Sequence, residues 1–208
     1  MPNESLPERG WRGSPKVWLD AAYAALVEHG VDAVKILPLA QSLKLSRTSF
    51  YWFFKDRNQL LDALLDRWEN STTGHLVRAT EDYAATETEA MLNVISSFLP
   101  DDRFDSRLEQ AVRSWAQQDS KVVERVQQAD TVRLDALTKM LVRWGHAPDD
   151  ADVRARTIYL VQIGYISMRV EEPMDIRLQR FPHYVEIYTG KRPPEEEMAR
   201  FRARIGHR

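Results

Sequence analysis

The chain has 208 residues, of which 43% are hydrophobic, so it can bury a substantial core and is not predicted to be disordered. Its formal net charge of −2 excludes a protein that coats nucleic acid along its whole surface, since that requires a large excess of Lys and Arg. Any nucleic-acid site must therefore be local. The absence of cysteine excludes disulfides, thiolate metal sites and cysteine nucleophiles.

No apolar run approaches the roughly 20 residues that a membrane helix needs, and the polar start MPNESLPERG lacks the apolar core of a signal peptide. We therefore expect a soluble, cytoplasmic protein without a membrane partner. Helical periodicity extends through almost every segment, and glycine and proline mostly fall between segments. These patterns predict an all-α fold.

The amino-terminal segments carry clear helix boundaries. Ser14 followed by Pro15 predicts a helix that ends at Gly30, and a second helix is expected over residues 36–43. Ser46 is placed to cap a third, short helix that runs to about residue 53. Asp56 with Gln59 has the spacing of a capping box, which predicts a long fourth helix from about residue 57.

The remaining segments continue the helical pattern. Capping-box spacing at Thr86 and Ser106 predicts two further helices, and another is expected over residues 120–144. A helix over residues 150–170 follows, then a segment that Pro182 starts or kinks, and finally a helix opened by a proline pair at residues 193–194. The 150–170 segment has almost no polar face, so it must be covered on both sides. A second subunit is one possible cover, and a central position in the core is the alternative.

The short third helix carries the pattern of a DNA-reading element. Residues 43–58 have a net charge of +3, although an ordinary solvated loop would also explain this charge. The exposed side of the helix is expected to show Arg47, Thr48, Ser49 and Trp52. Arg47 can donate to a guanine edge or a phosphate, and the short hydroxyl side chains let a helix sit deep in the major groove. Five adjacent aromatic residues at 50–54 cannot all face inward, and we expect the first and the last of them to do so.

The order of residues 14–68 resembles the amino-terminal domain of the TetR family of bacterial transcriptional regulators. The matching features are Leu39-Ala40, Ser46, Tyr51, Phe54, Arg57 and Leu60-Leu61. Lys44 departs from the pattern, because the family commonly has glycine in this turn. If the backbone there is left-handed, a lysine costs on the order of 1 kcal/mol.

The resemblance implies a helix-turn-helix DNA-binding domain over residues 1–58 and a helical ligand-binding and dimerisation domain over residues 59–208. It implies a homodimer that binds a palindromic DNA operator, usually as a repressor, and that responds to a small-molecule effector. The candidate DNA-binding residues are Arg47, Thr48, Ser49, Tyr51, Trp52, Lys55, Arg57 and Lys35. Tyr51 matches a phosphate-binding position of the family, and Arg57 lies at a helix N-terminus that itself favours phosphate.

Two residue sets are candidates for the functions of the second domain. The expected ligand-binding residues are Met91, Phe98, Arg113, Trp115, Trp144 and Tyr159, with the arginine as an anchor for an anionic group. Plain core packing is the alternative interpretation of this set. The expected dimer-interface residues are Ile158, Val161, Gln162, Tyr165, Met168 and Tyr184.

Other functions are less well supported by the sequence. The five histidines have no metal-ligand spacing, and no glycine-rich phosphate loop is present, so we expect no enzyme activity, no metal and no cofactor. A ligand-binding or interaction protein of the same fold, without tight DNA binding, remains the alternative to a DNA-binding regulator.

Overall fold

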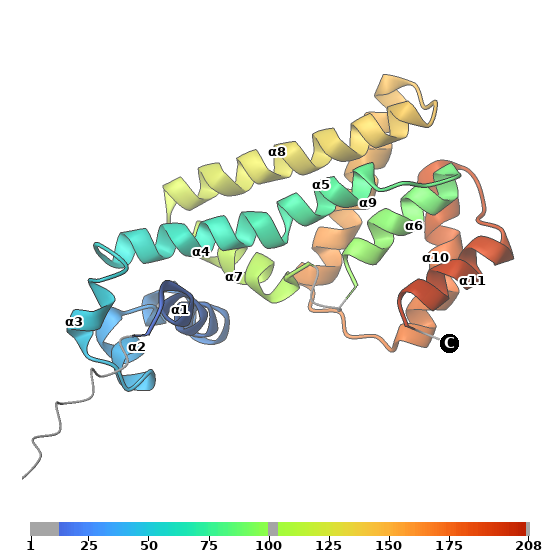
Figure 1. Cartoon of the computed structure of the whole chain (residues 1–208). Coiled ribbons are helices and arrows are strands. Elements are labelled where there is room, and N and C mark those ends of the chain that lie inside the picture. Colours follow the sequence, from blue (N-terminus) through green and yellow to red (C-terminus); the bar gives the residue numbers. More distant parts are fainter. Residues whose placement is uncertain (1–12, 100–103, 207–208) are drawn as a thin grey trace, which may run out of the picture. The chain divides into compact units, whose positions relative to one another are not determined.

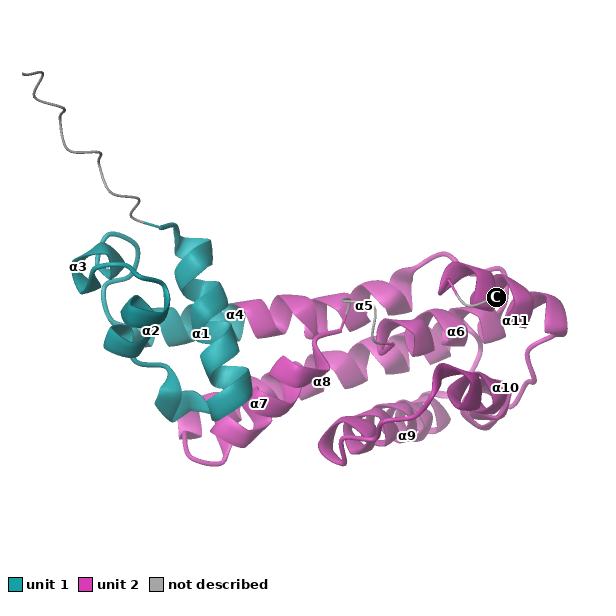
Figure 2. Ribbon diagram, turned by 90° about the horizontal axis from the view of Figure 1, so that it is seen from below, with its two compact units in different colours: residues 1–66 teal, residues 67–208 magenta. Residues whose placement is uncertain are grey.

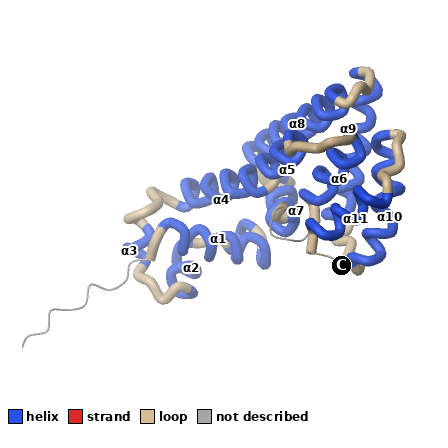
Figure 3. The backbone as a smooth tube through the Cα atoms, turned by 45° about the vertical axis from the view of Figure 1, so that its right-hand side comes forward, coloured by secondary structure: helices blue, strands red, loops and turns tan. Residues whose placement is uncertain are grey.

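The computed structural model describes residues 13–99 and 104–206, and this part of the chain consists of helices and loops without any β-strand (Figures 1 and 3). The amino-terminal elements are α1 (Pro15–His29), the single 3-10 turn η1 (Val31–Ala33), α2 (Ile36–Ser42), α3 (Arg47–Phe50) and α4 (Arg57–Ser71). They are followed by α5 (Thr73–Glu81), α6 (Glu87–Ser97), α7 (Ser106–Ala116), α8 (Ser120–Arg143), α9 (Pro148–Ser167), α10 (Met174–Thr189) and α11 (Glu195–Arg204). The all-α prediction is confirmed.

The chain divides into two compact units, residues 1–66 and residues 67–208 (Figure 2). The division falls inside α4, eight residues beyond the boundary that the sequence suggested. The polar start of the chain lies outside the described residues. None of the helices formed by the described residues combines the length and the apolar character needed to cross a bilayer.

Most helix starts follow the capping signals in the sequence. The predicted caps that accept a hydrogen bond from the backbone N–H three residues later are Ser14, Ser46, Asp56 and Thr86. One cap is shifted, because Asp105 and not Ser106 accepts the N–H of Leu108, at 2.9 Å, so that Ser106 is the first residue of α7. Local side-chain chemistry therefore sets these boundaries.

Three helices differ from the prediction. The α-helical part of α3 ends at Phe50, and turns continue the chain to residue 53. The long helix predicted from residue 57 is interrupted at Thr72, whose hydroxyl donates to the carbonyl of Trp68 at 2.6 Å. Such back-bonding from a threonine competes with the regular helix and bends it. Finally, α10 begins at Met174, so Pro182 lies inside that helix and does not start it.

Among the described residues, the apolar helix α9 is covered on one side only. Ala151, Ala155 and Ile158 belong to the buried core of the second unit, together with side chains from α5, α6, α8, α10 and α11. Val153 and Leu160 are exposed on α9. The core position of one face is therefore confirmed, and cover of the exposed apolar residues by a second subunit stays a prediction.

Candidate nucleic-acid interface

The exposed side of the helix-turn-helix module carries most of the predicted DNA-binding side chains. Arg47 and Thr48 on α3 are exposed, and Trp52, just after the helix, has 65% of its surface accessible. The Nη2 atom of Arg47 donates to the Tyr51 hydroxyl at 3.3 Å, which orients both side chains on this surface. Lys35 and Lys55 are also exposed.

Ser49 is different, because only 4% of its surface is accessible. Its hydroxyl donates to the carbonyl oxygen of Ser46 at 2.7 Å, and its backbone N–H donates to the Ser46 hydroxyl at 3.2 Å. The prediction that Ser49 lies on the exposed side of the helix is wrong. Its polar atoms stabilise the first turn of α3, where they are not presented to a DNA base.

The aromatic run divides as expected. Phe50 and Phe54 are buried and stack on one another with ring centroids 5.5 Å apart, and Phe50 also makes an edge contact with Trp18 on α1. Tyr51 and Trp52 point outward and are exposed. The inward rings anchor the short helix to its neighbours, so that the outward rings are held on a rigid support.

The turn between α2 and α3 adopts the conformation that usually favours glycine. Lys44 has φ of +55°, in the left-handed region. Backbone hydrogen bonds from Lys44 to Gln41 and from Leu45 to Ala40 close this turn, at 3.1 and 2.9 Å. The turn geometry is therefore retained despite the lysine, at a cost of about 1 kcal/mol of backbone strain. The lysine side chain adds an exposed positive charge beside α3.

Arg57 holds the module together from inside. Its Nε atom donates to the carbonyl of Val34 at 2.6 Å, and its Nη2 atom donates to the carbonyl of Val31 at 2.8 Å. The guanidinium therefore braces the turn that leads into α2. This use of the side chain makes a direct phosphate contact by the guanidinium difficult, although the N-terminus of α4 still offers its backbone N–H groups.

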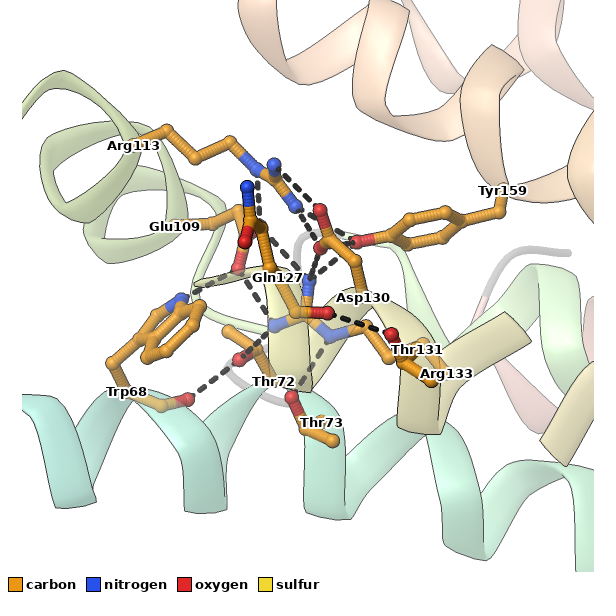
Figure 4. A network of polar contacts seen from close by, with 10 residues as sticks. All are labelled: Trp68, Thr72, Thr73, Glu109, Arg113, Gln127, Asp130, Thr131, Arg133 and Tyr159. Carbon is orange, nitrogen blue, oxygen red and sulfur yellow. Dashed lines mark hydrogen bonds and ion pairs between the residues drawn. The ribbon is translucent and has the colours of Figure 1, made fainter. Parts of the chain in front are cut away.

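A buried polar network lies in the second unit, where two of the predicted ligand-binding residues are found (Figure 4). Its centre is Arg133 on α8, which has no accessible surface and contacts Glu109 on α7, equally buried. All five N–H donors of the Arg133 guanidinium have acceptors: two from the Glu109 carboxylate and one each from Thr72, Thr73 and Tyr159. The indole of Trp68 donates to Glu109 as well, at 2.6 Å.

Arg113 and Tyr159, predicted to contact a ligand, are partners within this network. Arg113 donates to Glu109 at 2.7 Å and to both carboxylate oxygens of Asp130, and the Tyr159 hydroxyl donates to Asp130 at 2.5 Å. The two arginines balance the two carboxylates in charge. Arg113 is therefore compensated inside the protein, and the expectation that it anchors an anionic ligand is not carried further.

The electrostatics of the network follow from burial and pairing. Burial alone would raise the pKa of the Glu109 carboxyl, but the charges and hydrogen bonds of Arg133 and Arg113 outweigh it and hold this pKa below its usual value. Burial raises the pKa of the Tyr159 phenol. Glu109 is therefore ionised and Tyr159 is protonated at neutral pH.

The other predicted ligand-binding residues are separated from one another. Met91 and Trp115 are buried, and Trp144 is half-buried against the core. Phe98 lines a pocket between α6, α9 and α10 that the other five residues of the set do not line. The predicted ligand set does not form one site.

Most of the predicted dimer-interface residues line this same pocket. Ile158 is buried, whereas Val161, Gln162, Tyr165 and Tyr184 are half-buried around the pocket. Met168 lies apart from them and has 78% of its surface accessible. Sequence reasoning missed the pocket residues Val94, Ile95, Arg177 and Arg180, because helical spacing alone does not distinguish a pocket wall from packed core. Within the described residues, no group of His, Asp and Glu side chains is placed to hold a metal ion.

The helix-turn-helix module, joined to a larger helical unit, defines a DNA-binding transcriptional regulator. Residues 19–64 match the family of bacterial regulatory proteins described as the tetR family. Over these residues the chain carries the DNA-binding domain of this family.

Solved structures share the fold over nearly the whole chain. A transcriptional regulator from Rhodococcus sp. Rha1 is 17% identical, with a TM-score of 0.59 over 92% of this chain and 97% of its own. AmtR from Mycobacterium smegmatis is 16% identical, with a TM-score of 0.58 over 98% and 99%. GusR from Salmonella enterica is 12% identical, with a TM-score of 0.62 over 97% and 96%. No curated protein shows a significant match to this sequence.

Proposed function

We propose that the chain is a repressor that binds a palindromic DNA operator as a homodimer and releases it in response to a small-molecule effector. The observation that carries the DNA-reading part is the exposed face of α3, where Arg47 and Thr48 follow the Ser46 cap. In this proposal these two side chains contact base edges, which specify sequence. Tyr51, Trp52, Lys35 and Lys55 contact the sugar-phosphate backbone or flank the groove.

Two residues have a different role from the one first expected of them. Ser49 and Arg57 support the module from within, the first by closing the turn of α3 and the second by bracing residues 31–34. Substituting them would weaken DNA binding through the fold of the module. The proposed reading surface therefore consists of exposed side chains alone.

The homodimer is supported by an apolar surface on two helices. Val153, Leu160 and Met168 are exposed on or just after α9 at helical spacing, and Ile176 and Ile187 are exposed on α10. A two-fold dimer that buries such a surface would present two recognition helices, and half-sites about 34 Å apart would place these helices in successive major grooves. An effector would act by favouring a dimer geometry that no longer matches this spacing.

The experiment that tests this function is selection of duplexes from a random pool by the purified full chain, combined with sedimentation of the free protein. A repressor of this kind enriches a palindrome, protects two half-sites one helical turn apart, and sediments as a dimer that Leu160→Glu dissociates. Failure to enrich any duplex at low salt would leave the alternative, a ligand-binding protein of the same fold. Members of this family are generally not enzymes, and we propose no catalytic role.

A further inference from the structure

The pocket between α6, α9 and α10 has apolar walls and is narrow. Its walls are formed by Val94, Ile95, Phe98, Ile158, Val161 and Phe181. Its cavity volume is about 40 Å³, which on this measure is space for roughly three water molecules. A tail of about three or four carbon atoms would fill a space of this size, whereas a fused ring system would not enter without movement of the helices.

One positive charge in the lining has no negative partner among the described residues. Arg180 is paired with Glu172, whose Oε1 atom lies 2.5 Å from its Nη1 atom. Arg177 is half-buried, and its guanidinium stands 5.6 Å from the centre of the Tyr165 ring. Among residues 13–99 and 104–206, no carboxylate pairs with Arg177. A cation that is partly removed from water without an ion pair is costly, and a bound anion would compensate it.

Two neutral polar groups in the lining also make no hydrogen bond with any described residue. Tyr188 has only 6% of its surface accessible, and its hydroxyl has no hydrogen-bond partner within the described part of the chain. The half-buried amide of Gln162 has none either. Neither polar group is among the fully enclosed atoms without a partner, so each stays accessible in the pocket, where a ligand can reach it. By contrast, the hydroxyls of Tyr165 and Tyr184 are 3.0 Å apart and satisfy one another.

The unpartnered groups match the chemistry of a carboxylate. Burial raises the pKa of Tyr188, so its phenol is a hydrogen-bond donor at neutral pH. Arg177 and the Gln162 amide supply further donors, and a carboxylate offers two oxygens with about four acceptor positions. A cationic ligand would be repelled by the Arg177 charge, and an uncharged alcohol would leave that charge uncompensated.

From these observations we infer that the pocket between α6, α9 and α10 binds a short-chain organic carboxylate, with its tail between the apolar walls and its head group on Arg177, Tyr188 and Gln162. The carboxylate can bind whether or not the protein is a DNA-binding repressor, but its role as the effector rests on the proposed function. Since the pocket lies between the two helices that carry the exposed apolar surface, a ligand there is placed to change their spacing.

The exposed apolar residues of α9 and its end lie on more than one side of the helix. At about 100° per residue, Leu160 lies roughly opposite Ile158 and Tyr165, which line the pocket. Met168, just after the helix and seven positions after Val161, lies on the pocket side. Insertion of a partner side chain into the pocket is an outcome that the experiment below detects.

The test is calorimetric titration of the purified full chain with butanoate and pentanoate, using butan-1-ol and butylamine as probes of the same tail without the carboxylate. Saturable binding of the acids, with no binding of the alcohol or the amine, is the expected result. Arg177→Met should weaken acid binding by about tenfold or more, and Tyr188→Phe by a smaller factor, because each removes a donor to a charged acceptor. Arg177→Lys, which keeps the charge, should restore part of the binding. Arg107→Met, at an exposed arginine on α7 outside the pocket, should bind as the parent protein does.

Three results would overturn the inference: no binding of either acid, equal binding by Arg177→Met, or equal binding of the alcohol. If Arg177→Met dissociates the dimer and leaves acid binding unchanged, the pocket belongs to the interface between two copies. Operator binding without ligand is measured separately, so loss of the carboxylate inference and loss of the proposed function can be told apart. If the protein binds the acids but selects no duplex, the carboxylate-binding inference is supported and the proposed regulatory function is excluded.

Discussion

Replacement of Glu109 by glutamine should destabilise the second unit strongly. The carboxylate accepts four hydrogen bonds, one from Trp68, one from Arg113 and two from Arg133, at 2.6 to 3.0 Å. A glutamine keeps the shape but removes the charge, and its NH₂ group would face donors in place of acceptors. The only carboxylate still paired with the fully buried Arg133 among the described residues would be that of Asp130, at a longer distance of 3.8 Å. Removing one partner of a buried ion pair costs about 3–5 kcal/mol, a large part of the total stability of a typical domain.

The assay is urea unfolding followed by far-ultraviolet circular dichroism, at one fixed protein concentration because a dimer would make stability concentration-dependent. The matched control is Glu69→Gln, which breaks the partly exposed ion pair of Glu69 with Arg125, 2.8 Å apart. Exposed pairs contribute only about 0.2–1 kcal/mol. If the two variants lose the same small free energy, the network does not hold the second unit together and the reasoning is refuted.

Three further predictions concern single residues. The pKa of Glu109 is lowered on folding from an ordinary value of 4.5, so its contribution to stability is present above that pH and is lost as the pH falls through the folded-state value. The difference in unfolding free energy between the parent protein and Glu109→Gln should therefore shrink from pH 6 to pH 3. A constant difference would contradict this. Lys44→Gly should raise the unfolding free energy by about 0.5 kcal/mol, because relief of the left-handed backbone strain exceeds the added entropy of the unfolded chain. A loss of stability in urea would show that the turn is not strained. Arg57→Met should lower the unfolding free energy by about 2 kcal/mol, since it leaves the carbonyls of Val31 and Val34 without their charged donor. Arg57→Lys should not restore this free energy fully. If Arg57→Met has the same thermal midpoint as the parent protein, Arg57 does not brace the module.

The sequence predicted the parts of the fold that local chemistry decides. Ser14, Ser46 and Thr86 cap helices because each side-chain oxygen reaches a backbone N–H only three residues away. The left-handed turn at Lys44 could also be anticipated, since the family resemblance places glycine there. Such signals lie within one helical turn and can be read without knowing the tertiary structure.

The parts that were missed depend on residues far apart in the chain. Arg133 is satisfied by Glu109 and Thr72, which precede it by 24 and 61 positions, so nothing near Arg133 reveals its partners. Arg57 reaches the carbonyl of Val34 across 23 positions and thereby becomes a brace. For the same reason the pocket could not be located, because its lining comes from three helices and only its apolar spacing is visible in sequence.

The buried serine of α3 shows a limit of a different kind. A periodic pattern places residue 49 beside residue 48, but the helix is only four residues long, so small differences in direction decide which side chain is exposed. Ser49 faces inward and bonds to Ser46. The reading surface is therefore narrower than the sequence suggested, and it rests mainly on Arg47 and Thr48.

The DNA-reading role of α3 is tested by the affinity of a selected duplex for the double variant Arg47→Ala with Tyr51→Phe, measured by fluorescence anisotropy at two salt concentrations. Arg200→Ala on α11, an exposed arginine of the second unit, is the control. We expect that the parent protein and the control bind alike and that their affinity falls steeply with salt. The double variant should bind at least about tenfold more weakly while keeping its thermal midpoint. Equal binding by the double variant would show that α3 does not read DNA.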